Sequence, residues 1–447
     1  MVRPRHPRDP EGTGHFMPLN PRLVRDTFTH IEDQREKAAS YFYGRLFAEN
    51  PRLRTMFPPA MDVQRDRLFS ALTEIVRSLD SPDTLDTYLG HLGRDHRKFG
   101  VEAGHYDAVG AALMATVRRF AGPAWTAEAA QAWSEAYGLA AQMMIEAAEE
   151  HSAWAPPWWH AEVIDLVRPR HDMARLTLRP NQPYSYLPGQ YLSLQAARWP
   201  RVWRPYSIAN APRGDNLLRL VVRAVPGGWV SNALVTHTRL GDHVLLGPPR
   251  GSMVLDAASD RALVCVAGGS GIAPIKAIIE QVVGLPHRRS VLLLYAAGER
   301  RELTEIADLL EIQATYPWLR VIPVLGSDPG PPAAERPRRR ASAEKPVGDA
   351  VIGRPHEAIA GLGPLDEHDA YVCGPPAMVR AVLPRLRAAG VRRSRIYHDL
   401  PETGTGAGEH ADAEEGESGE RRDGTGRTSG SEGAPSGPRE NLDHSAL

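Results

Sequence analysis

Three side chains near the middle of the chain have the chemistry to hold a dinucleotide. Arg204, Tyr206 and Ser207 stand within one four-residue stretch, Arg-Pro-Tyr-Ser. An arginine can pair with two phosphate oxygens, a tyrosine ring can stack on a flat heterocycle, and a serine hydroxyl can hydrogen-bond the edge of that heterocycle. A flavin dinucleotide requires these contacts. Alone, the stretch would equally suit a strand with an exposed arginine.

A glycine turn further along the chain supports the flavin site. Gly227 and Gly228 come shortly before Ser231. Glycines let the backbone approach a phosphate with its amide groups exposed. Upstream, Tyr191 begins an apolar strand after the turn at Gly189. We assign Tyr191, the glycine turn and Ser231 to the same cofactor site.

A second glycine-rich stretch, Gly-Gly-Ser-Gly-Ile-Ala-Pro, follows an apolar strand at residues 262–267 and opens a helix expected over 275–283. A helix N-terminus attracts phosphate, and a proline suits the first helical turn. The spacing differs from G-x-G-x-x-G, so a strand–helix turn without a ligand is the alternative. The residues that we assign to a nucleotide here are Gly268, Gly269, Gly271, Ile272 and Pro274.

The run Cys373-Gly374-Pro375 favours a ligand at that turn. It follows another expected strand, and open α/β sheets bind their ligands at the carboxyl ends of their strands. We add these three residues to the nucleotide site, with Cys373 as a positioning residue rather than a nucleophile. Cys265 is the other cysteine of the chain, and two cysteines in apolar runs predict reduced thiols in a cytosolic protein.

A histidine in the first third of the chain could ligate a haem. His96 stands four residues after Leu92, on the same helical face. A haem takes one neutral imidazole, oriented by a hydrogen bond from its other nitrogen. Tyr106 and Glu150 are the candidates for that bond. The alternative is a histidine with a structural role only.

Three residues could form the opposite wall of such a haem pocket. Tyr43 and Gln64 could donate hydrogen bonds to dioxygen, and Phe57, next to a Pro-Pro corner, could pack on the haem. The alternative for each is a core aromatic side chain or a solvated amide.

The elements that must position these residues fall into consecutive regions. Apolar residues recur at helical spacing in the first region, short strands between turns follow, and strands then alternate with helices. These patterns predict an all-α domain, an antiparallel β-barrel and an α/β domain with a parallel sheet. The boundaries are 1–20 (flexible), 21–152 (haem), 153–256 (flavin), 257–401 (nucleotide) and 402–447 (disordered).

Composition excludes several kinds of partner. The net charge is -1 and no long apolar run is present, which argues against nucleic acid, a membrane span and a signal peptide. We expect a cytoplasmic protein, and a monomer. A Pro- and Arg-rich insertion at 326–345 would suit a partner site or a solvated loop.

The motifs together resemble two related families. Residues 159–400 look like the ferredoxin–NADP reductase family in their Arg-x-Tyr-Ser, Gly-Gly-x-Gly-Ile-Ala-Pro and Cys-Gly-Pro motifs. From about residue 22 onward the chain resembles the flavohaemoglobins: residues 42–51 match the distal helix, His96 the proximal ligand, and Tyr106 and Glu150 its partners. This resemblance implies haem b, FAD and NAD(P)H as cofactors, and O₂ and NO as small-molecule partners.

The resemblance also implies an activity, nitric oxide dioxygenase. The chain departs from the family at Asp95, where a lysine is common, and at Asp399 and Pro401, where a glutamate and an aromatic residue are expected. Two alternatives therefore stay open: an NAD(P)H-dependent flavin reductase or oxidase, and a haem-based gas or redox sensor. The choice between NADH and NADPH is also open, because Glu299 is followed by two arginines.

Overall fold

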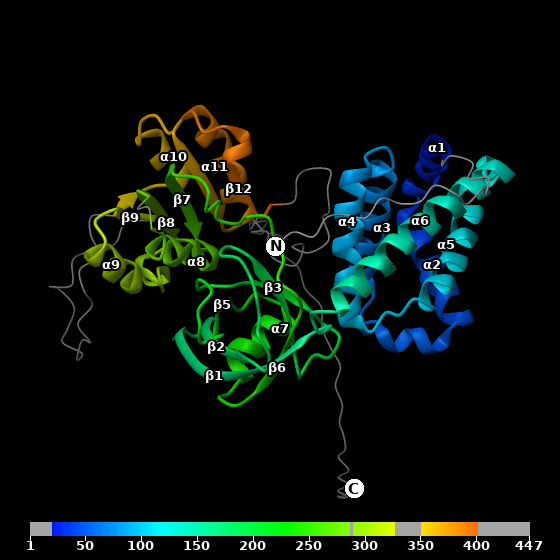
Figure 1. Ribbon diagram of the computed structural model, residues 1–447, viewed down its shortest axis with the longest axis horizontal. Coiled ribbons are helices and arrows are strands. Elements are labelled where there is room, and N and C mark those ends of the chain that lie inside the picture. Colours follow the sequence, from blue (N-terminus) through cyan, green and yellow to red (C-terminus); the bar gives the residue numbers. More distant parts are fainter. Residues whose placement is uncertain (1–19, 287–288, 327–349, 401–447) are drawn as a thin grey trace, which may run out of the picture. The chain divides into compact units, whose positions relative to one another are not determined.

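The first region of the chain is an all-α bundle, as predicted (Figure 1). The computed structural model describes residues 20–286, 289–326 and 350–400; Pro401, the tail from 402 and all but Gly326 of the 326–345 insertion lie outside them. Short 3-10 turns follow several of the helices. The helices are α1 (Pro21–Glu32), α2 (Arg35–Glu49), α3 (Asp62–Ser78), α4 (Pro82–His96), α5 (His105–Ala121) and α6 (Ala127–Ser152).

Apolar spacing and capping explain why these segments are helical. In α2, Ala39, Phe42 and Leu46 recur at intervals of three or four residues, and all are buried. Thr126 caps α6, because its hydroxyl accepts a hydrogen bond from the backbone N–H of Ala129 at 3.2 Å. The buried faces of all six helices form one core.

The second region is an antiparallel sheet that is nearly closed into a barrel. Its strand order is β4-β3-β6-β1-β2-β5, and a bridge between Ile208 and Leu220 joins the two outer strands. Alternate residues of the strands fill the interior. The strands are β1 (Trp159–Arg170), β2 (Met173–Pro180), β3 (Tyr191–Ala196), β4 (Arg204–Ser207), β5 (Leu218–Arg223) and β6 (His243–Leu246).

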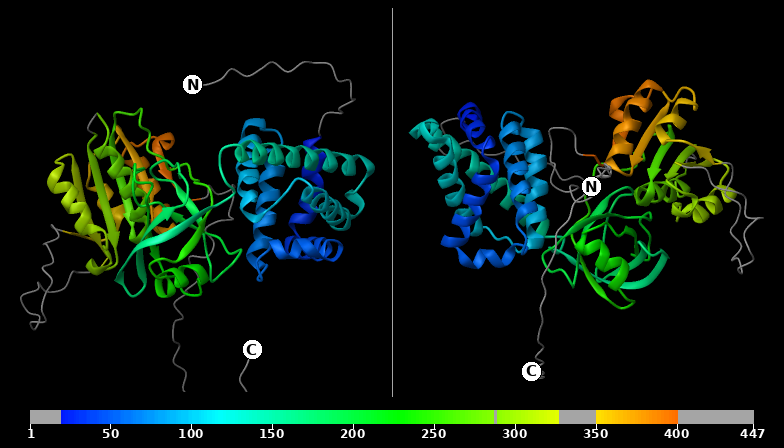
Figure 2. Two further views of the ribbon diagram at one scale, coloured as in Figure 1. Left: turned by 60° about the horizontal axis from the view of Figure 1, so that its bottom comes forward. Right: turned by 180° about the vertical axis from the view of Figure 1, so that it is seen from behind.

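The third region is a parallel sheet with the order β10-β9-β8-β7-β11-β12. Helices α8 and α9 pack on one face and α10 and α11 on the other (Figure 2). The strands are β7 (Ala262–Gly268), β8 (Val291–Ala297), β9 (Leu319–Leu325), β10 (Val351–Ile352), β11 (His368–Cys373) and β12 (Ile396–His398). The helices are α8 (Ile272–Val283), α9 (Ile306–Thr315), α10 (Pro355–Ala360) and α11 (Pro376–Ala388).

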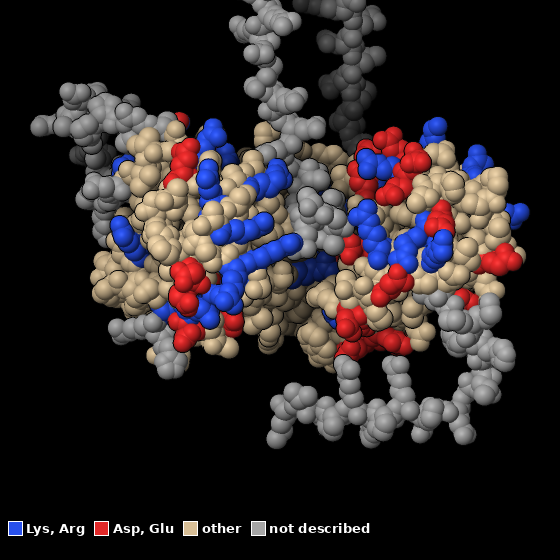
Figure 3. Space-filling model, turned by 90° about the horizontal axis from the view of Figure 1, so that it is seen from above, with Lys and Arg blue, Asp and Glu red and all other residues tan. Residues whose placement is uncertain are grey.

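The charged side chains of the described residues form a mixed surface. Basic and acidic groups both occur on the face in Figure 3, as the net charge of -1 predicts. Within the described ranges, none of the helices combines the length and the apolar character that crossing a membrane requires.

Candidate functional site

His96 is the last residue of α4 and faces the interior of the helical bundle. Its Nδ1 lies 2.7 Å from the carbonyl oxygen of Leu92. Because a carbonyl oxygen only accepts, Nδ1 carries the proton and Nε2 keeps its lone pair. Burial lowers the pKa of His96, so the imidazole is neutral at pH 7. A neutral imidazole with an available Nε2 is the ligand that haem iron requires.

The orienting partner of His96 differs from the expected ones. The backbone carbonyl of Tyr106 accepts a hydrogen bond from the Tyr137 hydroxyl at 2.6 Å, and burial raises the pKa of Tyr106 to about 12. Glu150 is exposed and acts electrostatically on Arg94. The hydrogen bond from His96 goes instead to its own helix. The four-residue spacing to Leu92 is visible in the sequence, but the partners predicted for this bond were Tyr106 and Glu150.

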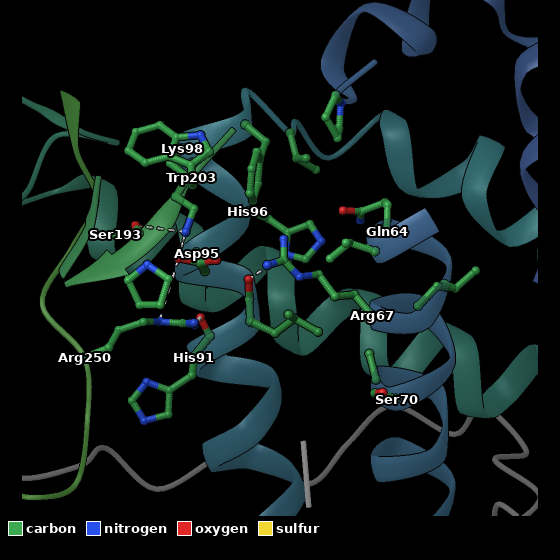
Figure 4. Close-up of a pocket in the computed structure, with 18 of the residues that line it drawn as sticks. Gln64, Arg67, Ser70, His91, Asp95, His96, Lys98, Ser193, Trp203 and Arg250 are labelled. Carbon is green, nitrogen blue, oxygen red and sulfur yellow. Dashed lines mark hydrogen bonds and ion pairs between the residues drawn. The ribbon is translucent and has the colours of Figure 1, made fainter. Parts of the chain in front are cut away.

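The polar residues expected opposite His96, Tyr43 and Gln64, line the same cavity as His96. The Tyr43 hydroxyl, from α2, donates to the backbone carbonyl of Gln64 at 3.2 Å, and burial raises the pKa of Tyr43. The ring of Phe57 meets Tyr43 edge-on, with centroids 5.6 Å apart. Gln64 extends from α3 toward His96 (Figure 4). Arg67, which sequence reasoning missed, points the same way from one turn further along α3.

A single cavity of about 1350 Å³ joins the surroundings of His96 to the barrel. Its walls in the helical bundle are mostly apolar, which suits the porphyrin face of a haem, and its lining includes His96. The residues present therefore fit a haem. The apolar walls in the bundle include Phe42, Leu46, Phe57, Leu68, Leu72, Val109 and Leu113.

The barrel contributes several predicted flavin residues to the same cavity. Strand β4 pairs with β3 so that Ser207 faces Tyr191, and Arg204 lies three residues away from Ser207 on the same strand. Tyr191, Arg204 and the turn at residues 227–228 all line the cavity. Tyr206 instead packs, partly buried, against the barrel core, and burial raises its pKa.

The glycine turn of the barrel is held by Ser231. Gly227 has a φ of 73°, which favours glycine. A Cβ atom on Gly228 would lie 2.5 Å from the Ser231 Oγ. That Oγ accepts a hydrogen bond from the backbone N–H of Val225 at 3.3 Å. Ser231 therefore fixes the shape of the turn from beneath it. Together with the cavity-lining arginine, this turn fits the pyrophosphate of a flavin dinucleotide.

The two stretches assigned to the nucleotide lie against each other at the carboxyl ends of neighbouring strands. Strand β7 pairs with β11, and a Cβ atom on Gly271 would lie 2.6 Å from the carbonyl oxygen of Cys373 and 2.7 Å from the Cα of Gly374. Gly268 is equally close to Met378, with 2.6 Å between its added Cβ and the sulfur. Glycine is required here because the two loops touch. Ile272 and Pro274 are buried at the start of α8, whereas Pro375 directly precedes α11.

Comparison with known proteins gives a consistent result for each region. The globin family matches residues 40–144, the oxidoreductase FAD-binding domain matches 161–254, and the oxidoreductase NAD-binding domain matches 265–383. A flavohemoprotein of Chromobacterium violaceum is 28% identical over 410 residues, which cover 85% of this chain and 96% of the relative. The flavohemoprotein of Bordetella pertussis is also 28% identical, over 86% of this chain and 97% of the relative.

The chain thus combines a globin domain with FAD-binding and NAD-binding oxidoreductase domains. Over most of its length it is similar to flavohemoproteins. A crystal structure of a flavohemoglobin from Malassezia yamatoensis with bound FAD and heme has the same fold, with a TM-score of 0.67 at 18% identity, over 85% of this chain and 97% of that one. The cofactors of the chain are accordingly haem, FAD and a nicotinamide nucleotide.

One departure from the flavohaemoprotein pattern precedes the histidine. Asp95 stands where the family commonly has lysine, and its side chain is 10% exposed. Burial alone would raise the pKa of Asp95, but Lys98 and Arg250 hold that pKa below its ordinary value. Asp95 is therefore a paired anion.

The second departure is Asp399, beside the nucleotide loops. Its Oδ2 lies 4.0 Å from the Sγ of Cys373. Burial raises the pKa of Cys373, so its thiol is protonated at pH 7, which suits a positioning role. Burial also raises the pKa of Asp399 to about 6 from an ordinary value of 3.8.

This raised pKa predicts how stability depends on pH. The folded chain binds the Asp399 proton more tightly than the unfolded chain, so the stabilising contribution is complete below about pH 4 and lost as the pH rises through 6. Asp399→Asn should therefore stabilise the chain at pH 7.5 by roughly 1 to 2 kcal/mol and have almost no effect at pH 4. Urea unfolding at both pH values measures this difference. The exposed Asp260→Asn is the control, and an equal effect at both pH values would contradict the assignment.

Proposed function

We propose that this chain is a nitric oxide dioxygenase, which converts nitric oxide and dioxygen into nitrate with electrons from NADH or NADPH. The observation that carries the proposal is the continuous cavity. Its lining includes His96, Tyr43 and Gln64 in the helical bundle, and Arg204 with the glycine turn in the barrel. A haem site that shares a cavity with a flavin site is arranged for repeated reduction, which a protein that only stores oxygen does not need.

The electron balance of the reaction explains why three cofactors are needed. Oxidation of nitric oxide to nitrate releases three electrons, and dioxygen takes up four, so each turnover needs one further electron. The residues assigned to the nucleotide, the flavin and the haem would hold three cofactors, which would together supply hydride transfer and single-electron transfer. One NADH therefore supports the conversion of two molecules of nitric oxide.

The roles that we propose for the residues follow from their positions. His96 ligates the iron through Nε2, while Leu92 orients the ring. Tyr43 and Gln64 present polar groups on the opposite side, where the gaseous substrates meet, and Phe57 packs against Tyr43. For Tyr106 and Glu150 we propose support of the helical pocket rather than a bond to His96. The proposed flavin contacts are Tyr191, Arg204, Gly227 and Gly228, which line the cavity. Tyr206, Ser207 and Ser231 would support this flavin site from the strand and from beneath the turn. The proposed nucleotide contacts are Gly268, Gly269, Gly271, Ile272, Pro274, Cys373, Gly374 and Pro375.

The reaction can be tested in steps. The protein is first reduced without oxygen by NADH or, separately, NADPH, while flavin and Soret absorbance are recorded. Oxygen and nitric oxide are then added, and nitrate is measured. We expect flavin reduction, then haem reduction, and then one nitrate for each nitric oxide consumed.

Tyr43→Phe should slow nitric oxide consumption and leave haem reduction unchanged, with Tyr41→Phe on the same helix as the matched control.

Two outcomes would replace this proposal with the alternatives. Flavin reduction without haem reduction would indicate an NAD(P)H-dependent flavin reductase or oxidase. Complete haem reduction without catalytic loss of nitric oxide would indicate a gas or redox sensor.

A further inference from the structure

Five residues connect the end of α4 to the barrel, and we refer to them as the docking cluster. Asp95, Lys98 and Phe99 flank His96 in sequence, and Trp203 directly precedes Arg204. Arg250 follows β6 and pairs through its backbone with Tyr191. The cluster thus lies next to both the proposed iron ligand and the proposed flavin residues.

The ionic part of the cluster is built around one carboxylate. The Lys98 Nζ lies 2.7 Å and the Arg250 Nε 3.7 Å from the same Oδ1 of Asp95. Lys98 also donates to the Ser193 hydroxyl at 3.0 Å, and Arg250 donates to the His91 carbonyl at 2.8 Å (Figure 4). The side chains of Lys98, Asp95 and Arg250 are only 4%, 10% and 16% exposed. Lys98 of the helical bundle therefore contacts the barrel at Ser193. Arg250, which follows a barrel strand, contacts α4 at Asp95 and His91.

The aromatic part of the cluster runs from the histidine to the flavin strand. The ring of Phe99 lies 6.3 Å from that of His96 and 6.4 Å from that of Trp203. The Lys98 ammonium group lies over both Phe99 and Trp203, at 5.1 and 5.4 Å from their centroids. The same cation therefore belongs to the ionic and the aromatic contact, which couples their geometry.

Charge balance makes Asp95 the residue on which the cluster depends. Two poorly exposed cations share its single carboxylate, so its removal takes the shared counter-ion from both in a region that water reaches poorly. A lysine at this position would add a third cation. The family's common residue is thus incompatible with Lys98 and Arg250 in this arrangement.

We propose that the docking cluster holds the flavin strand β4 against the end of α4, and that Asp95 and Arg250 are positioning residues for electron passage from the flavin site to the haem site. This inference rests on the electron flow of the proposed function, but not on its gaseous substrates. Lys98, Phe99 and Trp203 form the contact, and the ion pairs keep it closed.

A double-mutant cycle tests the proposal. Arg250→Gln, Asp95→Asn and the double variant are mixed with NADH without oxygen, and flavin and haem reduction are recorded separately. We expect haem reduction to slow by about tenfold or more in each single variant, since displacements of about 1 Å in a reacting geometry have effects of this size. Flavin reduction should keep its rate. The double variant should be no slower than the slower single variant, because both substitutions open the same contact.

Matched controls separate this role from a general loss of stability. Asp86→Asn on α4 and Arg239→Gln on the barrel change the same charges at exposed positions and should change haem reduction by less than about twofold. Arg250→Lys keeps the charge and should restore most of the rate. The haem midpoint potential should stay the same in Arg250→Gln, whereas a changed haem pocket would shift it.

Hydrogen exchange gives a readout that does not depend on turnover. In the haem-free chain, Arg250→Gln should increase amide exchange at residues 91–99 and 191–196 and leave α8 unchanged. Three results would overturn the proposal. Haem reduction could keep its wild-type rate in both single variants, the two substitutions could slow it additively in the double variant, or flavin reduction could slow as much as haem reduction. Normal haem reduction without nitrate formation would instead refute the proposed function alone.

Discussion

Substitution of His96 by glycine should remove the axial ligand and lower the haem affinity of the chain by at least about 100-fold. Loss of a residue that only hydrogen-bonds a metal ligand usually has a smaller effect. The imidazole Nε2 is the ring nitrogen left available by the bond to Leu92. A glycine leaves a space that free imidazole can enter, so millimolar imidazole should restore the Soret band. Flavin reduction by NADH should be unaffected.

Haem titration of the purified chain, followed by its absorbance spectrum, measures this effect. His30→Gln, an exposed histidine on α1, is the matched control and should bind haem normally. An unchanged Soret spectrum in the His96 variant would refute the assignment, since another group would then have to ligate the iron.

Gly93→Ala should have the next largest effect, although this residue touches no cofactor. A Cβ atom at Gly93 would lie 2.2 Å from the backbone oxygen of Met144 and 2.7 Å from its Cα. Backbone atoms of α6 cannot move aside individually, so α4 and α6 must separate. The expected loss is about 3 kcal/mol or more, at the upper end of overpacking effects, and His96 is displaced with its helix.

Gly90→Ala is the matched control for this prediction. It lies one turn earlier on α4, and the nearest atom to its added Cβ is the Nη1 of the flexible Arg94 side chain, at 3.4 Å. Alanine favours a helix over glycine by up to about 1 kcal/mol, so this variant should be neutral or slightly stabilised. Urea unfolding followed by circular dichroism compares the two. Equal unfolding midpoints would show that the helix contact is looser than described.

The sequence predicted those parts of the fold whose signals are local. The strand expected at 262–267 is β7 (Ala262–Gly268), and the helix expected from residue 275 begins earlier, at Ile272. The early start is physically reasonable because a proline such as Pro274 is tolerated in the first turn. Strands β10 and β12 were not predicted, since each has only two or three residues and little periodicity.

Contacts between distant residues were beyond local pattern analysis. In the sequence Asp95 stands out only as a departure from the family, because its partner Arg250 stands 155 positions later and the sequence does not indicate that they meet. Gly93 has no distinguishing neighbours in sequence either, and its importance comes from Met144 on another helix. By contrast, the glycine loops of the nucleotide site were predicted because strand, turn and helix follow one another directly.

The bond from His96 to Leu92 also bears on how such a chain could arise. Both groups belong to one turn of one helix, so the orientation of the ligand is inherited with a short segment and needs nothing from the barrel. An ancestral globin could therefore have been joined to a reductase without rebuilding its metal site. The fusion required a new contact between the helical domain and the barrel, and in this chain Asp95 lies at the centre of that contact.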